Sequence, residues 1–271
     1  MTYLVTGARG QVGRAVIDAL LAAGKPVRAA SSRPEDTTVP AAVPVVGLDP
    51  ADPASAAAAV DGVERAFLYA AGSGIDTLVA AAKAAGVQHI TLLSSSAAAT
   101  PGNPIGDRHL VVERPLQESG LPLTILRPGA FAGNARWWLS GVRSDGVVGL
   151  PFPEVQQNPI HEADIADAAV ISLTEPGHAG KIYPLTGPES LSLRRMVELL
   201  AEAVDRPLRV ERISYDQAKA FLYEPVLAMW AAAGDAPAPV GPTAESVTGK
   251  PARTFAQWAA DHATELRSAT A

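Results

Sequence analysis

Three glycines near the start of the chain have the spacing of a turn that can hold a phosphate group. Gly7, Gly10 and Gly13 follow a short apolar stretch and precede an alanine- and leucine-rich run with helical character up to Ala23. Backbone N–H groups at a helix start favour a bound negative charge. We expect Gly7 to form the turn and Gly10 to let a diphosphate approach the backbone. Gly13 would let the helix lie against the preceding strand.

A second apolar stretch, Val27 to Ala30, follows the helix at the distance expected for a strand–helix–strand unit that binds a dinucleotide. Glycine also serves ordinary turns, so a purely structural turn is the alternative. The position of the glycines between a strand and a helix favours the nucleotide site.

The residues after this second stretch bear on which dinucleotide binds. An acidic side chain usually contacts the free 2′-hydroxyl of NAD at this place, but the chain carries Ser32 and Arg33 there. Arg33, with Arg9 from the glycine turn, can pair with a 2′-phosphate in bidentate fashion. We therefore predict NADP(H) rather than NAD as the cofactor. The alternative is that both arginines are merely solvated.

His109 and Glu113 stand four residues apart and share one face of a predicted helix. Glu113 would hold His109 in one tautomer and stabilise its charged form, which gives a general acid or base that titrates near neutral pH. Ser94 or Ser96 would donate a hydrogen bond to a substrate carbonyl. The alternative is a pair that only stabilises its helix, by about 0.3–0.5 kcal/mol. Pro115 is expected to kink this helix or end a turn.

The elements that must position these residues are strands alternating with helices. Strands are predicted at residues 3–5, 27–30, 43–48, 63–70, 88–93 and 121–126, and helices up to residue 23 and at 54–60, 75–85 and 107–119. This rhythm indicates an α/β fold with a parallel sheet covered on both faces. Ligands of such sheets bind at the carboxyl ends of the strands, so six strand ends are expected to form a single site.

Bulk properties exclude several classes of protein. The chain has 271 residues, of which 48% are hydrophobic and 18% charged, and its net charge is −6. It is therefore globular, and broad binding to nucleic acid or to anionic membranes is disfavoured. We expect no membrane span and no signal peptide, hence a cytoplasmic protein. The expected assembly is a monomer or a homodimer. It has no cysteine, and its five histidines lack ligand spacing, so no metal site is expected.

The second half has a looser rhythm. Helices are predicted at residues 164–173, 192–205, 215–233 and 254–267, with strands at 181–185 and 208–213. Ser192 and Thr254 are candidate N-caps, and Asp164 is expected to cap or stabilise its helix. We assign residues 1–134 to a dinucleotide-binding domain and residues 135–271 to a smaller, partly interwoven α+β lobe that binds substrate.

Several motifs along the chain resemble those of a known family. They are TGARGQVG (6–13), VVGLDPADPASAAAAVDGVERAFLYAA (45–71), LLSSSAA (92–98), HLVVE (109–113), SGLPLTILRPGAFAGN (119–134), DIADAA (164–169) and TGKPARTFAQW (248–258). The chain is similar to atypical short-chain dehydrogenases/reductases of the NmrA-like, NAD(P)H-binding kind. Among them it most resembles the NAD(P)H:quinone oxidoreductase type. That type also carries His-x-x-x-Glu at the position of the catalytic helix, which is the predicted helix at residues 107–119 in this chain.

The resemblance implies a Rossmann fold and roles for individual residues. The three glycines would hold the pyrophosphate, Arg33 the 2′-phosphate, and Leu48 with Asp49 the adenine. Residues 70–72 and 128–131 would line the nicotinamide side. The expected cofactor contacts are Gly7, Arg9, Gly10, Gln11, Val12, Gly13, Ser32, Arg33, Leu48, Asp49, Ala70, Ala71, Gly72, Ser94, Pro128, Gly129 and Phe131, and the expected substrate contacts are Phe131, Asn134, Trp137, Trp138 and Phe152.

One departure from the family pattern limits the chemistry. Typical short-chain dehydrogenases use Tyr-x-x-x-Lys as their proton donor, and the matching positions here are His109 and Glu113. A quinone or a conjugated or aromatic carbonyl compound needs little proton assistance to accept hydride, so an NADPH-dependent reductase of such compounds is the first hypothesis. The alternatives are a non-catalytic NADP(H)-binding redox sensor of the NmrA type, or a non-redox cyclase or dehydratase on the same fold.

Overall fold

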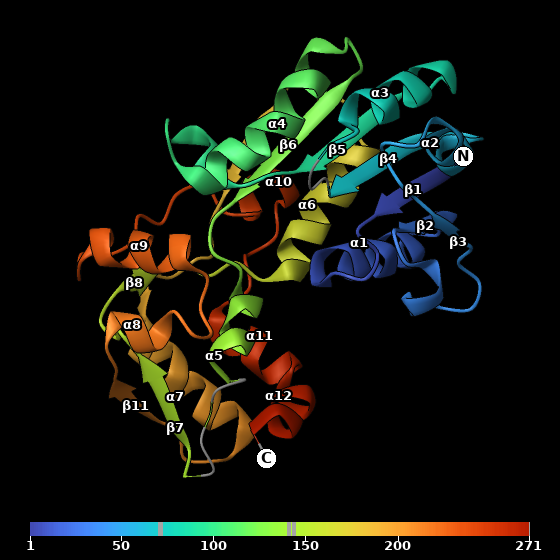
Figure 1. Cartoon of the computed structure of the whole chain (residues 1–271). Helices are drawn as coiled ribbons and strands as arrows, with labels where there is room; N and C mark the ends of the chain where they lie inside the picture. Colours follow the sequence, from blue (N-terminus) through green and yellow to red (C-terminus); the bar gives the residue numbers. More distant parts are fainter. Residues whose placement is uncertain (70–72, 140–141, 143–144, 271) are drawn as a thin grey trace. The chain divides into compact units, whose positions relative to one another are not determined.

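The computed structural model describes residues 1–69, 73–139, 142 and 145–270, which belong to two compact units (Figure 1). The first, which we call the sheet unit, comprises Met1–Pro128, Glu162–Leu185 and Ala244–Lys250. The second, the lobe unit, comprises Gly129–His161, Thr186–Thr243 and Pro251–Ala271. The predicted boundary after residue 134 therefore needs correction, because the sheet unit ends at Pro128 and two later segments return to it.

The sheet unit contains one parallel sheet of seven strands in the order β3-β2-β1-β4-β5-β6-β9. Its strands are β1 Thr2–Thr6, β2 Val27–Ser31, β3 Val45–Gly47, β4 Val63–Tyr69, β5 His89–Leu93, β6 Leu123–Pro128 and β9 Ile182–Leu185. All five residues of β5 are buried, as expected for a strand covered on both faces. The order reverses between β1 and β4, which is the arrangement of a doubly wound Rossmann sheet and confirms the predicted fold class.

Helices cover both faces of this sheet (Figure 1). Helices α2 (Pro53–Val60), α3 (Ile75–Ala84) and α4 (Pro104–Glu118) share a core with inward-facing strand residues such as Leu4 and Ile90. Helix α1 (Gln11–Ala22) packs against α6 (Glu162–Thr174), which also contacts β4, β5 and β6. The short α10 (Glu245–Thr248) packs on α6, and the 3₁₀ helices η1 (Pro34–Asp36) and η2 (Ser96–Ala99) follow β2 and β5.

The strand predicted at residues 181–185 forms, but not as part of a separate substrate lobe. As β9 it pairs with β6, in a register that places Ile125 opposite Ile182. The rhythm of the sequence loosens after residue 130 because the chain leaves the sheet there. It returns with α6 and β9, so a boundary drawn at a single position could not describe both segments.

Helix α4 runs through Pro115 instead of ending a turn there. A proline in a helix interior leaves the carbonyl four residues earlier without its N–H partner. That carbonyl belongs to Val111, whose side chain is 57% exposed, so water can solvate the site. The helix begins cleanly because Asn103 accepts hydrogen bonds from the N–H groups of Ile105 and Gly106.

The lobe unit has two small sheets and a helical core. Strand β7 (Val147–Leu150) pairs in parallel with β11 (Arg209–Arg212), and β8 (Gln156–Gln157) pairs antiparallel with β10 (Leu191–Ser192). Its helices are η3 Ala132–Asn134, α5 Ala135–Leu139, α7 Leu193–Val204, α8 Tyr215–Ala218, α9 Glu224–Ala233, α11 Phe255–Asp261 and α12 Ala263–Thr270. Among the helices of the described ranges, none is long and apolar enough to cross a membrane.

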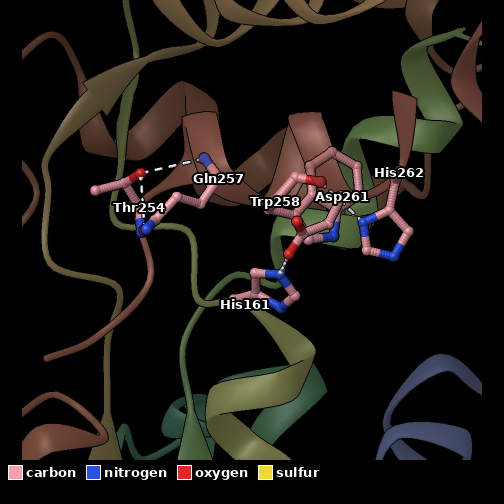
Figure 2. Close-up of polar contacts among 6 residues, drawn as sticks. All are labelled: His161, Thr254, Gln257, Trp258, Asp261 and His262. Atoms are coloured by element: carbon pink, nitrogen blue, oxygen red, sulfur yellow. Dashed lines mark hydrogen bonds and ion pairs between the residues drawn. The ribbon is translucent and has the colours of Figure 1, made fainter. Parts of the chain in front are cut away.

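Both predicted N-caps of the lobe unit are confirmed. The Ser192 hydroxyl accepts the N–H of Arg195 at the start of α7, and Thr254 forms a reciprocal capping box with Gln257 at the start of α11 (Figure 2). The predicted final helix is divided at His262, whose Nδ1 lies 2.8 Å from the Trp258 carbonyl oxygen. Buried His161 lies 3.3 Å from the carboxylate of Asp261 through its Nε2 (Figure 2), which ties the end of α11 to the segment before α6.

Buried His89 links β5 to β6 at the amino ends of the strands. Its Nε2 lies 3.0 Å from the hydroxyl oxygen of Thr124, and that hydroxyl donates its proton to the His178 carbonyl at 2.8 Å. Thr124 must therefore accept from His89, which fixes the Nε2–H tautomer. Burial, aided by the positive charges of Arg65 and His178, lowers the pKa of His89 to about 4.

This pKa predicts a pH-dependent loss of stability. In the unfolded chain the pKa of His89 returns to about 6.5. Below that pH the unfolded chain binds a proton at His89 that the folded protein does not bind. The free energy of unfolding is therefore highest above about pH 6.5 and falls as the pH drops toward about 4. Between pH 7 and pH 5 the free energy of unfolding should fall by up to about 2 kcal/mol through His89 alone. Urea unfolding at both pH values should show this loss reduced in His89→Gln; an identical loss in both proteins would contradict it.

Candidate functional site

The glycine turn after β1 admits no side chain where the helix meets it. Gly7 has φ +66°, a left-handed conformation that favours glycine, and its carbonyl accepts the N–H of Gly10 at 2.8 Å. A Cβ on Gly13 would lie 2.2 Å from the Gly7 carbonyl oxygen, closer than any contact allows. Helix α1 can therefore lie against the turn only because residue 13 is glycine.

The start of α1 presents its N–H groups for an anion. Gly10 is the N-cap, no hydrogen bond from a side chain caps the helix, and its first turn lacks acidic residues. The amides of Gln11, Val12 and Gly13 are among those that such a start leaves without carbonyl partners inside the helix. This arrangement at the carboxyl end of β1 suits a diphosphate, so the residues present fit a dinucleotide.

A pocket of about 410 Å³ lies at the carboxyl ends of β2 and β3. Ser32, Leu48 and Asp49, three of the predicted cofactor contacts, line it together with Gly47, Pro50 and Ser55. The loop is ordered locally: the Asp49 N–H donates to the Ser55 hydroxyl oxygen at 2.9 Å, and the Asp49 carboxylate accepts the N–H of Ala51 at 3.0 Å. The place and the lining suit the adenosine half of a dinucleotide.

The two arginines predicted to read the 2′-position are both exposed. Arg9 lies in the glycine turn, and Arg33 lies two residues after the end of β2, with a side chain that is 59% exposed. The Nη1 atom of Arg33 lies 3.6 Å from an Oδ2 atom of Asp36. Arg33 is therefore accessible to a ligand, and it already has an acidic neighbour.

Sequence reasoning overlooked Tyr69 at the end of β4. Its side chain is 48% exposed, and its Cβ is 2.9 Å from where a Cβ on Gly7 would lie. An aromatic residue directly after the apolar run Ala66–Leu68, at the end of a predicted strand, was the signal that could have found it. The next predicted contacts, Ala70, Ala71 and Gly72, lie outside the described residues.

Glu113 does not orient His109, and this part of the prediction is wrong. Its side chain is wholly buried and accepts the Ser94 hydroxyl proton. Both of its oxygens also pair with the guanidinium of Arg127, which donates through Nε at 2.9 Å and through Nη2. A buried carboxylate needs a cation and further hydrogen bonds, and the partners of Glu113 come from the ends of β5 and β6 rather than from its own helix.

The same contacts change what Ser94 can do. Its only hydroxyl proton is donated to Glu113, so it cannot be donated to a substrate carbonyl. Ser96, the other predicted donor, is exposed at the start of η2. Ser94, Glu113 and Arg127 together form a buried polar cluster that ties β5, α4 and β6 to one another.

His109 lies half-buried on α4, one turn before Glu113. Burial lowers the pKa of His109, against a smaller raising effect of the Glu113 charge. The imidazole is therefore neutral at neutral pH, and it is suited to donate a hydrogen bond through its N–H rather than to deliver a full proton. Gly106 lets α4 approach the loop after β5, since a Cβ there would lie 2.1 Å from the Ala97 carbonyl oxygen.

Pro128 ends β6 in the sheet unit, while the remaining predicted contacts belong to the lobe unit. Gly129 and Phe131 begin that unit, and Phe131 pairs with Ile160 through an isolated bridge. Trp137 is 47% exposed. Phe131, Asn134 and Trp137 stay predicted substrate contacts.

Two aromatic residues assigned to the substrate pocket contact the lobe core. Trp138 is 3% exposed and meets Trp230 edge-to-face at 6.2 Å between ring centroids. Phe152 meets Tyr215 in the same way at 6.4 Å. Trp138 also lines a small cavity of about 190 Å³ between β7, β11 and α8. This packing leaves little of the Trp138 ring for a ligand, whereas Phe152 is only partly buried and stays a predicted substrate contact.

Known proteins are similar to this chain in sequence and in fold. The family model described as NAD(P)H-binding matches residues 7–176. The (4-alkanoyl-5-oxo-2,5-dihydrofuran-3-yl)methyl phosphate reductase of Streptomyces griseus is 37% identical over 96% of this chain and 97% of its own. NAD(P)H azoreductase of Xenophilus azovorans is 32% identical over 98% and 99%. The crystal structure of the NADPH-dependent quinone oxidoreductase of Escherichia coli in complex with NADPH is 25% identical over 96% and 99%, with a TM-score of 0.76.

The glycine turn can be tested with a substitution that the fold tolerates. A Cβ on Gly10 would lie 3.3 Å from the Gly7 carbonyl oxygen and closer to no other atom, whereas Gly13 has no such room. Gly10→Ala should leave the unfolding midpoint of the free protein within a few degrees of wild type, and it should weaken NADPH binding by at least about tenfold, since the methyl group stands where the diphosphate approaches. Gly241→Ala, whose Cβ would also fit, is the matched control. Unchanged NADPH affinity in Gly10→Ala would contradict this site.

Proposed function

The chain belongs to the NAD(P)H-binding family, and we propose that it is an NADPH-dependent reductase of quinones or of conjugated or aromatic carbonyl compounds. The observation that carries the proposal is the uncapped N-terminus of α1 behind the Gly7–Gly13 turn. The adenosine-sized pocket on the same sheet edge supports it, and so do relatives named as reductases over nearly their whole length.

The cofactor contacts follow from the sheet unit. The amides at the start of α1 would hold the diphosphate, and the pocket lined by Ser32, Leu48 and Asp49 would hold the adenosine. Arg33 would pair with the 2′-phosphate, which favours NADPH over NADH. Tyr69, beside Gly7, would cover the turn once a dinucleotide lies on it.

A bound reduced nicotinamide would supply a hydride, and the acceptor would determine how much the protein must stabilise the charge that develops on it. The relatives are named for reducing a quinone, an azo compound and an oxo-dihydrofuran with an alkanoyl group. In each class, oxygen or nitrogen atoms in conjugation can take up the added electrons. A hydrogen bond from neutral His109 to such an atom stabilises the charge that develops there, without a Tyr–Lys pair. Glu113 and Arg127 would not contact the substrate; their ion pair would position His109 by holding α4 against β5 and β6.

We also infer that the substrate is a small molecule and that the protein works in the cytoplasm as a monomer or homodimer. The named reductase relatives support the first part. The absence of cysteine supports the cytoplasmic location. The net charge of −6 disfavours extensive self-association, which supports a monomer or homodimer.

Turnover tests the proposal directly. The protein is incubated with NADPH and, separately, with quinones, enones and azo dyes, and loss of the reduced-nicotinamide absorbance is followed. We expect oxidation of NADPH with at least one acceptor class, and Gly10→Ala should lose it. Tight NADPH binding without turnover on any acceptor would support the redox sensor instead, and product formation with no change in NADPH would support a cyclase or dehydratase.

His109 is expected to contribute to the rate but not to cofactor binding. His109→Ala should lower kcat by about 10- to 100-fold, because one hydrogen bond to the developing charge is lost. His109→Gln, which keeps an N–H donor, should recover part of the loss, and NADPH affinity should be unchanged in both. Because burial lowers the pKa of His109, the wild-type rate should show no fall from neutral pH upward. A falling rate would show that protonated His109 is the active form.

A further inference from the structure

Arg33 and Asp36 form an ion pair at the place where the 2′-substituent of a dinucleotide is read. The Nη1 atom of Arg33 is 3.6 Å from Oδ2 of Asp36, and the two side chains are 59% and 50% exposed. Both charges therefore face water and are accessible to a ligand. A solvent-exposed pair of this kind is weak, so an incoming phosphate can displace the carboxylate.

The backbone keeps these two residues together. The Arg33 N–H donates to the Ser31 hydroxyl oxygen at 3.1 Å. The Arg33 carbonyl accepts both the Thr37 hydroxyl at 2.9 Å and the Asp36 N–H at 3.2 Å. Pro34 begins the single 3₁₀ turn η1, and its ring fixes φ. These local contacts thus hold Asp36 one turn from Arg33.

Other charged groups near this turn have different partners. The Arg14 guanidinium donates to the Thr38 carbonyl at 2.9 Å, and the Asp49 carboxylate accepts the N–H of Ala51. Glu35 is exposed beside Asp36 on η1. In the part of the chain that the structure describes, Asp36 is the carboxylate that pairs with Arg33, and Glu35 provides a neighbouring acid of the same charge for comparison.

We propose that Asp36 is a specificity-determining residue that competes with the cofactor's 2′-phosphate for Arg33 and so weakens the preference for NADPH over NADH. This inference rests on the proposed function. The 2′-phosphate of NADPH would compete with the Asp36 carboxylate for the guanidinium, and it would then lie near a like charge. NADH carries a hydroxyl there and meets neither cost. The chain would consequently accept both cofactors, with NADPH preferred by less than Arg33 alone would allow.

The test measures the dissociation constants of NADPH and NADH by titration against cofactor fluorescence, which needs no turnover. Asp36→Asn should tighten NADPH binding by about 3- to 10-fold and leave NADH unchanged, and the gain should shrink as salt is raised. Glu35→Gln removes the same charge one residue away and should change the NADPH-to-NADH ratio much less. In an Arg33→Ala background, Asp36→Asn should lose most of its effect, because there is no guanidinium to compete for.

Three results would overturn the inference: an unchanged ratio in Asp36→Asn, an equal effect of Glu35→Gln, or the full gain persisting without Arg33. Each of these leaves the reductase proposal standing. Conversely, cofactor binding that responds as expected but supports no turnover on any acceptor would remove the reductase proposal and leave the role of Asp36 intact.

Discussion

The contact between Gly13 and the Gly7 carbonyl is the constraint on which the rest of the site depends. A side chain at residue 13 would lie 2.2 Å from that oxygen, so the first turn of α1 can approach β1 only where Cβ is missing. This approach places uncapped amides at the carboxyl edge of the sheet. The helix dipole and these amides act in the same direction on an anion, and the pocket beyond β2 and β3 extends the same edge.

Helix α4 corresponds to the helix that carries the tyrosine and the lysine in typical short-chain dehydrogenases, but its charged groups are arranged differently. The Glu113 carboxylate is neutralised by Arg127 and hydrogen-bonded by Ser94, deep in the sheet unit. Removing one partner of such a buried pair leaves an uncompensated charge, which typically costs about 3–5 kcal/mol. Its role is therefore to fix α4 between β5 and β6. His109 is left as a half-buried neutral imidazole, which matches acceptors that can spread added charge over their own atoms.

The sequence predicted the sheet well because its signals are local. Short apolar strands and the glycines after β1 each act within a few residues, and their elements form as expected. The errors concern partners distant in sequence. Glu113 lies one turn from His109, yet its charge is matched by Arg127 on a strand, and Trp138 packs on Trp230 instead of facing a ligand. β9 pairs with β6 although more than fifty residues separate the two strands in the sequence. Spacing alone carries no information about these pairings.

The most direct test of the account is the response of individual backbone amides to NADPH, followed by heteronuclear NMR of the ¹⁵N-labelled protein. The account predicts that the amides of Gln11, Val12 and Gly13 shift most strongly, because the diphosphate accepts their hydrogen bonds. NADPH that binds while these three amides keep their free-protein positions would contradict the claim that the glycine turn holds the cofactor.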